Sequence, residues 1–436
     1  MDCSGNGGMK MSAFEKVIGY DTIKNELEQI CDMIHNREVY EALGAKLPQG
    51  VLLYGDPGLG KTLMAKCFIE ESDLEALIIR RDKGNDDFIS GITDTFRRAK
   101  ENAPCIVFLD DMDKFANEDS NHCDTAEYVA VQSGIDEVKN CGVFVLATAN
   151  DIDRLPDSLL RSGRFDRKIE VQCPTDRDAS EIIAHYLSDK KVAESVNLDD
   201  LCKMISYSSC AELETILNEA AIHAAYARKT AIGMEDLIRA VLRMQYDSPD
   251  NYTRTSADDM KKTALHEAGH LVVSEVLCPG SVGLASLRTS GRGSTGGFIH
   301  RCRELPRREH HALVSLAGKA AVELYYSESC ASGCASDIDR AFNVIRKGMS
   351  ENGTRGFGMI DVSTARFSRE SENMNARSEA ATHAELERCM FRTRDILLKN
   401  RAFLEKAAEA LMEKETLLAS DIRAIRESVT ITEAAG

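Results

Sequence analysis

Two short motifs in this chain of 436 residues bring together residue types that could do chemistry. Residues 266–270 read HEAGH, and residues 55–62 read GDPGLGKT. The first pattern places two histidines four residues apart around a glutamate, which suits a zinc ion and its activated water. The second is a glycine-rich loop ending in Lys-Thr, which suits the phosphates of ATP. Together they predict an enzyme that uses ATP hydrolysis to deliver substrates to a zinc peptidase.

The apolar residues around HEAGH have helical spacing, so His266 and His270 share one helix face and can reach one zinc ion. Glu267 would take a proton from the zinc-bound water, and the hydroxide would attack a peptide carbonyl. Two surface histidines beside a capping glutamate are the alternative without a metal. A catalytic zinc needs a third protein ligand. Spacing alone does not choose among the downstream acidic residues and His300, His310 and His311.

The glycine-rich loop follows a predicted strand and opens a predicted helix, as a phosphate-binding loop should. Its backbone N–H groups and the helix N-terminus would surround the phosphates. Lys61 would reach the β- and γ-phosphates, and Thr62 would bind Mg²⁺. Asp110 and Asp111, after another apolar run, would hold Mg²⁺ and polarise the attacking water, respectively. The loop residues assigned to the nucleotide are Gly55, Asp56, Pro57, Gly58, Leu59, Gly60, Lys61 and Thr62.

Short apolar runs alternate with amphipathic stretches between residues 14 and 171, which predicts a parallel sheet covered by helices on both faces. The expected strands are 51–54, 77–79, 105–109, 143–147 and 168–171. Four helical segments follow in 177–246, and residues 256–430 are mostly helical. The fold class is therefore an α/β core with a helical lid, followed by a mainly α-helical metallopeptidase domain. The expected divisions are a disordered start (1–12), a nucleotide-binding subdomain (13–173), a helical lid (174–247), a linker (248–257), a peptidase domain (258–430) and a flexible tail (431–436).

The composition of the chain limits the partners and the cellular compartment that we expect for this enzyme. The formal charge of −17 argues against a nucleic-acid partner. The 14 cysteines are scattered singly, which favours reduced thiols in the cytoplasm. No run of 18 apolar residues occurs, so we expect no membrane insertion.

The segments around the glycine-rich loop resemble those of AAA+ ATPases. VLATAN (145–150) resembles the sensor strand, which implies that Asn150 senses the γ-phosphate. LLRSGRFDR (159–167) resembles the arginine-finger segment, with Arg161 and Arg164 as candidates; a finger acts on a neighbour's nucleotide and implies a ring, usually a hexamer. FEKVIGY (14–20) resembles the segment that packs on adenine, which assigns Ile18 and Gly19 to the nucleotide. SSCAELETILNEAA (208–221) resembles the lid helix on the opposite side.

The second half resembles the FtsH family of membrane-anchored, ATP-dependent zinc proteases. The resemblance is carried by HEAGH, GGF (296–298), LAGKAAVELYY (316–326) and GCASDIDRAF (333–342). It implies that Asp337 is the third zinc ligand, and that His310 and His311 are surface residues at a helix start. It also implies Zn²⁺, ATP and Mg²⁺ as cofactors, protein or peptide substrates and a homohexamer. The family's N-terminal transmembrane helices have no counterpart in this sequence.

Three departures from the family leave alternatives open. Asp111 stands where the family has glutamate, and Cys210 replaces a glycine near the adenine. The segment 76–91 lacks the usual aromatic pore loop; Phe88-Ile89-Ser90-Gly91 is the nearest substitute, unless Phe88 packs into the helix that it begins. One alternative is a zinc peptidase with a weak or regulatory ATPase that acts on unfolded chains. Another is a non-proteolytic remodelling or chaperone ring.

Overall fold

The computed structural model describes residues 12–81, 85–117, 125–248, 256–288, 296–326, 331–352 and 372–434. Residues 1–11 of the expected disordered start and 249–255 of the expected linker lie outside these ranges. The contacts divide the chain into two compact units. The first comprises the described residues up to Asp189 together with Tyr207–Thr215, and the second comprises Lys190–Ser206 and the chain from Ile216 onward.

The first unit is built on a parallel sheet of five strands in the order β2-β3-β4-β1-β5. β3 and β4 are buried along their whole length, because helices cover both faces of the sheet. The sequence analysis predicted these five strands in the right places. Their bounds are β1 (Gly50–Tyr54), β2 (Glu75–Ile79), β3 (Cys105–Leu109), β4 (Val143–Ala149) and β5 (Arg167–Glu170).

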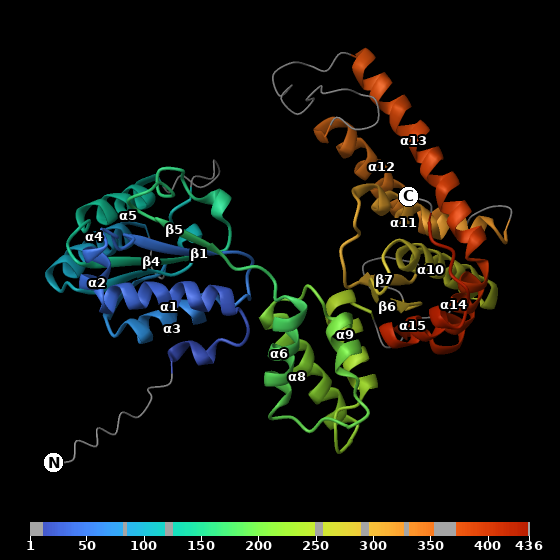
Figure 1. The fold of residues 1–436 in the computed structure, drawn as a ribbon, viewed down its shortest axis with the longest axis horizontal. Coiled ribbons are helices and arrows are strands. Elements are labelled where there is room, and N and C mark those ends of the chain that lie inside the picture. Colours follow the sequence, from blue (N-terminus) through green and yellow to red (C-terminus); the bar gives the residue numbers. More distant parts are fainter. Residues whose placement is uncertain are drawn as a thin grey trace. The chain divides into compact units, whose positions relative to one another are not determined.

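Helices α1 and α3 lie on one face of this sheet, and α4 and α5 lie on the other (Figure 1). Phe68 of α3 stacks on Phe144 of β4, with ring centroids 5.4 Å apart, on the first face. The loops after β1, β3 and β4 emerge at the carboxyl edge of the sheet, where α/β folds bind their ligands. The helices of this unit are α1 (Asp21–His35), α2 (Arg37–Ala42), α3 (Lys61–Ser72), α4 (Asn85–Glu101), α5 (Thr125–Glu137) and α6 (Asp176–Leu187), with short 3-10 turns at η1 (Ala13–Lys16), η2 (Met112–Lys114) and η3 (Ile152–Arg154).

The second unit is mainly helical, as predicted. Its central pair, α10 and α11, touch at the backbone: a Cβ on Gly269 of α10 would lie 2.5 Å from the carbonyl oxygen of Ala317. The helices are α7 (Leu198–Met204), α9 (Met234–Tyr246), α10 (Ala257–Leu277), α11 (Arg308–Glu323), α12 (Ala331–Asn352), α13 (Glu372–Lys399), α14 (Arg401–Lys414) and α15 (Ala419–Glu427), while α8 (Cys210–Tyr226) belongs partly to each unit.

A small antiparallel sheet in this unit escaped the sequence analysis. Its strands are β6 (Val282–Ser286), β7 (Phe298–Arg301) and β8 (Thr416–Leu418), in the order β7-β6-β8. The strands have only three to five residues, and β8 lies between α14 and α15 in the sequence. So short a run shows no alternation that distinguishes it from a loop.

The compact units do not follow the expected boundaries of the lid. Residues 190–206 and 216–246, which we assigned to the lid, pack with the peptidase domain. Part of the tail expected from residue 431 contacts the peptidase domain. Thr432 exchanges two backbone hydrogen bonds with the side chain of buried Asn400, at 2.8 and 3.0 Å. The chain is therefore held in place to this point, and only 435–436 lie beyond the described residues.

Phe88 packs into the core and lies within α4, so Phe88 to Gly91 form no loop. Its side chain is 5% exposed, and its ring meets Phe115 edge-on with centroids 5.3 Å apart. Of the two expectations for this residue, the structure supports packing into its own helix and corrects the pore-loop substitute.

Replacing Phe88 with alanine should therefore destabilise the nucleotide-binding subdomain by about 3–5 kcal/mol, the usual cost of emptying a buried aromatic site. The unfolding midpoint of that subdomain would fall in thermal denaturation. Phe391→Ala is the matched control, because Phe391 is 74% exposed and its removal leaves no cavity. A Phe88→Ala protein of normal stability that had lost ATP-dependent degradation would instead support the pore-loop role.

Candidate metal centre and nucleotide site

Three side chains from α10 and α12 converge. The Nε2 atom of His266 lies 3.2 Å from Oδ2 of Asp337, the Nε2 atom of His270 lies 3.4 Å from the same oxygen, and the two Nε2 atoms are 3.0 Å apart. A tetrahedral zinc ion with bonds of about 2.0–2.2 Å needs ligand atoms at roughly these separations. The donors are two imidazoles and one carboxylate, the set found in catalytic zinc sites. The residues therefore fit the metal.

The surroundings orient these ligands. Nδ1 of His270 donates a hydrogen bond of 2.7 Å to the carbonyl of Val314, which leaves Nε2 to face the metal. His266 hydrogen-bonds the thiol of Cys334 as well as Asp337. Gly318 of α11 makes room for the His266 ring, since a Cβ there would lie 2.4 Å from Cε1 of the imidazole.

The electrostatics favour a cation at this point. Burial lowers the pKa of the His266 imidazole, but the hydrogen bonds with Asp337 and Cys334 outweigh it and raise the pKa to about 10. Burial opposes ionisation of Asp337, yet its hydrogen bonds with the two histidines hold its pKa well below the usual range. A positive charge between these groups is thus stabilised, as a zinc ion would supply.

Glu267 lies next to this cluster and is 3% exposed. Burial raises the pKa of its carboxyl, as expected of a general base poised to hold a proton. The backbone before β7 closes its other side: a Cβ on Gly297 would lie 2.8 Å from Cγ of Glu267, and one on Gly296 would lie 3.9 Å from Oε1. Only glycine fits at position 297, because a Cβ there would also lie 2.2 Å from the carbonyl oxygen of Ser286.

A second site occupies the first unit as a cavity of about 580 Å³. This volume lies in the range of small-molecule and cofactor sites. The predicted residues Ile18, Asp111, Asn150 and the loop from Pro57 to Thr62 line it. Tyr20 and Ala211 also line it, and they lie in the segments 14–20 and 208–221 that the resemblance assigned to the nucleotide. Sequence reasoning missed other lining residues, among them Lys114, Ile182, His185 and Tyr186.

The glycine-rich loop is held by its own lysine. Nζ of Lys61 donates 2.7 Å hydrogen bonds to the carbonyls of Gly55 and Asp56, so these two residues act through their backbone rather than by lining the cavity. Gly58 and Gly60 have φ angles of 80° and 88°, the left-handed region that favours glycine. Burial lowers the pKa of the Lys61 ammonium.

The acidic pair after β3 is arranged for two tasks. Oδ1 of Asp110 accepts hydrogen bonds from the hydroxyls of Thr62 and Thr148, at 3.1 and 3.0 Å, so Thr62 and Asp110 can share a Mg²⁺ ion. The Asp111 N–H donates to the Thr148 hydroxyl at 2.9 Å, and the Asp111 carboxylate pairs with Lys114 at 2.6 Å. Thr148 was not predicted, although it stands two residues before Asn150 on β4.

Tyr20 organises the opposite end of the cavity. Its N–H donates to Oδ1 of Asp178 at 3.0 Å, and its hydroxyl donates to the carbonyl of Gln172 at 3.1 Å. The Tyr20 hydroxyl also contacts Sγ of Cys210 at 3.6 Å, so the cysteine fills the place of the family's glycine and lines the cavity. Gly19 has a φ of 69° and supports this turn without lining the cavity.

The two arginine-finger candidates differ. The Arg164 guanidinium is bound by Asp136 of its own chain, with Nε and Nη2 at 3.0 and 2.6 Å from the carboxylate, and it donates to the Ser158 carbonyl. Arg161 is exposed, and its guanidinium makes no hydrogen bond or ion pair with the described part of its own chain. Neither residue lines the chain's own cavity.

The other histidines lie outside the metal cluster. His300 bonds Tyr246 and Ser206 instead. His310 is corrected from a surface residue to a buried one, 8% exposed, because α11 starts at Arg308 and turns it inward. His311 is partly exposed beside Arg301.

Comparison with known proteins finds a family for each half of the chain. Residues 51–173 match the model of the ATPase family associated with various cellular activities, and residues 253–425 match that of peptidase family M41. The chain is 32% identical to the ATP-dependent zinc metalloprotease FtsH of Caldicellulosiruptor bescii, an alignment covering 95% of this chain and 72% of the relative. It is 33% identical to FtsH 1 of Thermomicrobium roseum, over 94% of this chain and 68% of the relative.

The chain belongs to the FtsH family. The two matched regions of this FtsH member contain the glycine-rich loop and the metal cluster, and the predicted fold and cofactors are confirmed. No helix among the described residues is long and apolar enough to cross a membrane.

We expect His266→Ala, His270→Ala and Asp337→Ala each to lose zinc, because each removes one of three ligands. Glu267→Gln should keep zinc and lose peptide cleavage, since its carboxylate handles protons rather than the metal. Metal analysis by mass spectrometry after gel filtration measures both, with His311→Ala as the matched control. A ligand variant that keeps its full zinc content would contradict the assignment.

Asp111→Asn should keep ATP binding and lower turnover at least about a hundredfold, because an amide cannot accept the proton of the attacking water. Asp111→Glu should match or exceed the wild-type rate, since its carboxylate reaches roughly 1.5 Å further. Phosphate release under saturating ATP measures both, and Asp94→Asn, an exposed carboxylate on α4, is the control. If Asp111→Glu collapses the rate, the local structure is fitted to aspartate.

Proposed function

We propose that this chain is an ATP-dependent zinc metalloendopeptidase that degrades protein substrates in a homohexameric ring. The observation that carries this proposal is the convergence of His266, His270 and Asp337 beside buried Glu267, in a chain that also holds a complete nucleotide cavity. A ring that only remodels its partners would need none of this cluster.

For peptide cleavage, zinc would supply a polarised water and a Lewis acid for the carbonyl oxygen. Glu267 takes the proton of that water and passes it to the leaving amine, so no net proton is consumed within the protein. β7 lies at the edge of its sheet among the described strands, and its start borders Glu267. An extended substrate would add to this edge by backbone hydrogen bonds and bring a peptide bond to Glu267.

For ATP hydrolysis, Lys61 would bind the phosphates, and Thr62 with Asp110 would hold Mg²⁺. Asp111 would orient the attacking water, and Asn150 would contact the γ-phosphate. Arg161, exposed and unpaired in its own described chain, is the better candidate for a finger in a neighbour's site. Arg164 supports the same segment through Asp136. A finger acting on a neighbour is what supports the ring.

One observation favours a second candidate function, in which ATP hydrolysis is slow. Nζ of Lys114 lies 2.6 Å from Oδ2 of Asp111, so the attacking water would compete with an ammonium group for that carboxylate oxygen. In that case the chain is a zinc peptidase with a slow or regulatory ATPase that cuts unfolded chains.

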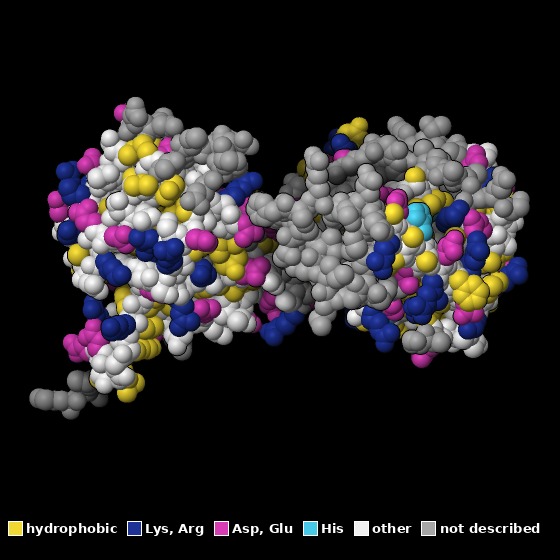
Figure 2. Space-filling view, turned by 90° about the horizontal axis from the view of Figure 1, so that it is seen from above, with side chains coloured by type: hydrophobic (Ala, Val, Ile, Leu, Met, Phe, Trp, Pro, Cys, Tyr) yellow, Lys and Arg dark blue, Asp and Glu magenta, His cyan; other side chains and the backbone are white. Residues whose placement is uncertain are grey.

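We also place the protein in the cytoplasm, without nucleic-acid partners. The described cysteines form no disulfide, as suits a reducing compartment. On the face seen in Figure 2, acidic and basic side chains of the described surface are interspersed, with no basic patch for a phosphate backbone.

The decisive experiment measures casein degradation by zinc-loaded protein with and without ATP. We expect ATP to be required for casein, and Lys61→Ala to abolish casein degradation while sparing an unstructured peptide. Casein degradation that is equally fast without ATP would favour the second candidate.

Rings that contain subunits of two variants test the arginine finger. Arg161→Ala should bind ATP and lose most hydrolysis, and mixing it with Lys61→Ala should restore part of the rate, because intact fingers then face intact pockets. Arg164→Ala is the comparison, and its effect should be on stability through Asp136. Full hydrolysis by a monomer, or by Arg161→Ala, would exclude a finger at Arg161.

A further inference from the structure

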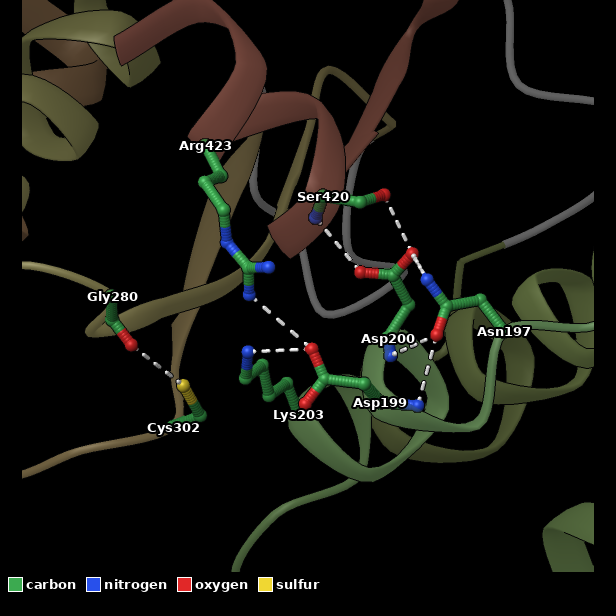
Figure 3. Close-up of polar contacts among 8 residues, drawn as sticks. All are labelled: Asn197, Asp199, Asp200, Lys203, Gly280, Cys302, Ser420 and Arg423. Carbon is green, nitrogen blue, oxygen red and sulfur yellow. Dashed lines mark hydrogen bonds and ion pairs between the residues drawn. The ribbon is translucent and has the colours of Figure 1, made fainter. Parts of the chain in front are cut away.

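Helix α7, which we assigned to the lid, is bonded to the peptidase domain within the second unit (Figure 3). The carboxylate of Asp200, 2% exposed, accepts hydrogen bonds from the backbone N–H and the hydroxyl of Ser420, at 2.8 and 2.6 Å. Asp200 thereby satisfies an N–H at the start of α15, where a negative charge is stabilised. Beside it, Asp199 pairs with Lys203 of α7 and with Arg423 of α15.

The same helix touches the small sheet directly. A Cβ on Gly283 of β6 would lie 2.2 Å from the carbonyl oxygen of Lys203, so the two backbones are in contact. Sγ of Cys302 donates to the carbonyl of Gly280 at 3.4 Å and ties the end of β7 to the start of β6 (Figure 3). α7 thus braces the sheet that carries β7.

Two further lid residues, Ser206 and Tyr246, contact β7 directly. Nε2 of His300 lies 2.9 Å from the hydroxyl of Ser206, and Nδ1 lies 2.7 Å from the hydroxyl of Tyr246. The Tyr246 ring stacks on Phe298 with centroids 3.9 Å apart. Burial lowers the pKa of His300 to about 4, so the imidazole is neutral near pH 7 and offers one donor and one acceptor nitrogen to the two hydroxyls.

The residue before Phe298 is Gly297, whose backbone lies against Glu267. We propose that Ser206 and Tyr246 are positioning residues of the peptidase, which hold β7 against Glu267 through His300 and Phe298. This inference rests on the proposed peptidase function. It makes these lid residues a working part of the proteolytic site, because a displacement of the base by about 1 Å can cost about a hundredfold in rate.

The zinc ligands provide the means to separate positioning from folding. They lie on α10 and α12, and none of the three has a hydrogen bond or ion pair with the described residues of β7, so loosening the strand should leave zinc binding intact. Tyr246→Ala removes the stack and the hydroxyl, Tyr246→Phe removes only the hydroxyl, and Ser206→Ala removes the other hydrogen bond to His300. Tyr226→Phe is the matched control, since Tyr226 is 87% exposed.

The full chain loaded with zinc is assayed on an unstructured fluorogenic peptide. We expect kcat to fall about tenfold or more in Tyr246→Ala, within the hundredfold that such a displacement can cost. Tyr246→Phe should recover much of this loss, and Ser206→Ala should show a smaller decrease. Zinc content and zinc affinity in chelator competition should stay at the wild-type level in all of them.

Binding of a peptide hydroxamate is the second readout and needs no turnover. The hydroxamate ligates zinc and hydrogen-bonds Glu267, so its affinity should fall in Tyr246→Ala in parallel with kcat. If the wild type binds the hydroxamate but cleaves no peptide, the proposed function fails while the hydroxamate series still tests the positioning. Unchanged kcat and unchanged hydroxamate affinity in Tyr246→Ala, or losses that follow zinc content, would overturn the inference.

Discussion

The close contact of α10 with α11 sets the geometry of the peptidase half. Helices with ordinary side chains pack about 8–10 Å apart, but Gly269 faces the Ala317 carbonyl, and Gly318 faces the His266 ring, each where a Cβ would clash. This lets the HEAGH motif press its imidazoles against α11, where the Val314 carbonyl fixes the tautomer of His270. Asp337 of α12 then meets both rings. The metal cluster is thus a consequence of two missing side chains as much as of its ligands.

Three carboxylates illustrate how partners assign roles to one residue type. Asp337 faces two imidazoles, which hold it ionised and ready for a cation. Asp110 accepts from two hydroxyls, which leave it an oxygen ligand for a hard metal ion. Asp111 is paired with the Lys114 ammonium, which would compete with the water in the role that we propose for this carboxylate. These three carboxylates were assigned different roles from the sequence, but the partners of each side chain are seen only in the structure.

The parts that followed from the sequence were those encoded locally. The five strands of the first unit and the helices around HEAGH came from the spacing of apolar residues, and the phosphate loop from its glycines and Lys61. Asp337 needed the resemblance, because 67 residues separate it from His270 and no spacing rule joins them. The small sheet and the contacts of Tyr20, Lys114, Thr148 and Tyr246 depend on tertiary packing, which no local pattern records. Phe88 shows the limit most simply: the same residues suit a loop or a helix start until a neighbouring ring, Phe115, is in place.

The two hydrogen bonds from Lys61 to its own loop affect how fast a nucleotide can enter. A loop of three glycines would lose much conformational entropy on closing round a phosphate chain. Here the ammonium already holds the Gly55 and Asp56 carbonyls, so that ordering accompanies folding rather than binding. When a phosphate binds, the Lys61 ammonium exchanges these carbonyl acceptors for phosphate oxygens, and the loop already has its shape. Association should then be governed by diffusion and charge, and the lifetime of a bound nucleotide by the side chains that line the cavity, such as Tyr20 and Ala211.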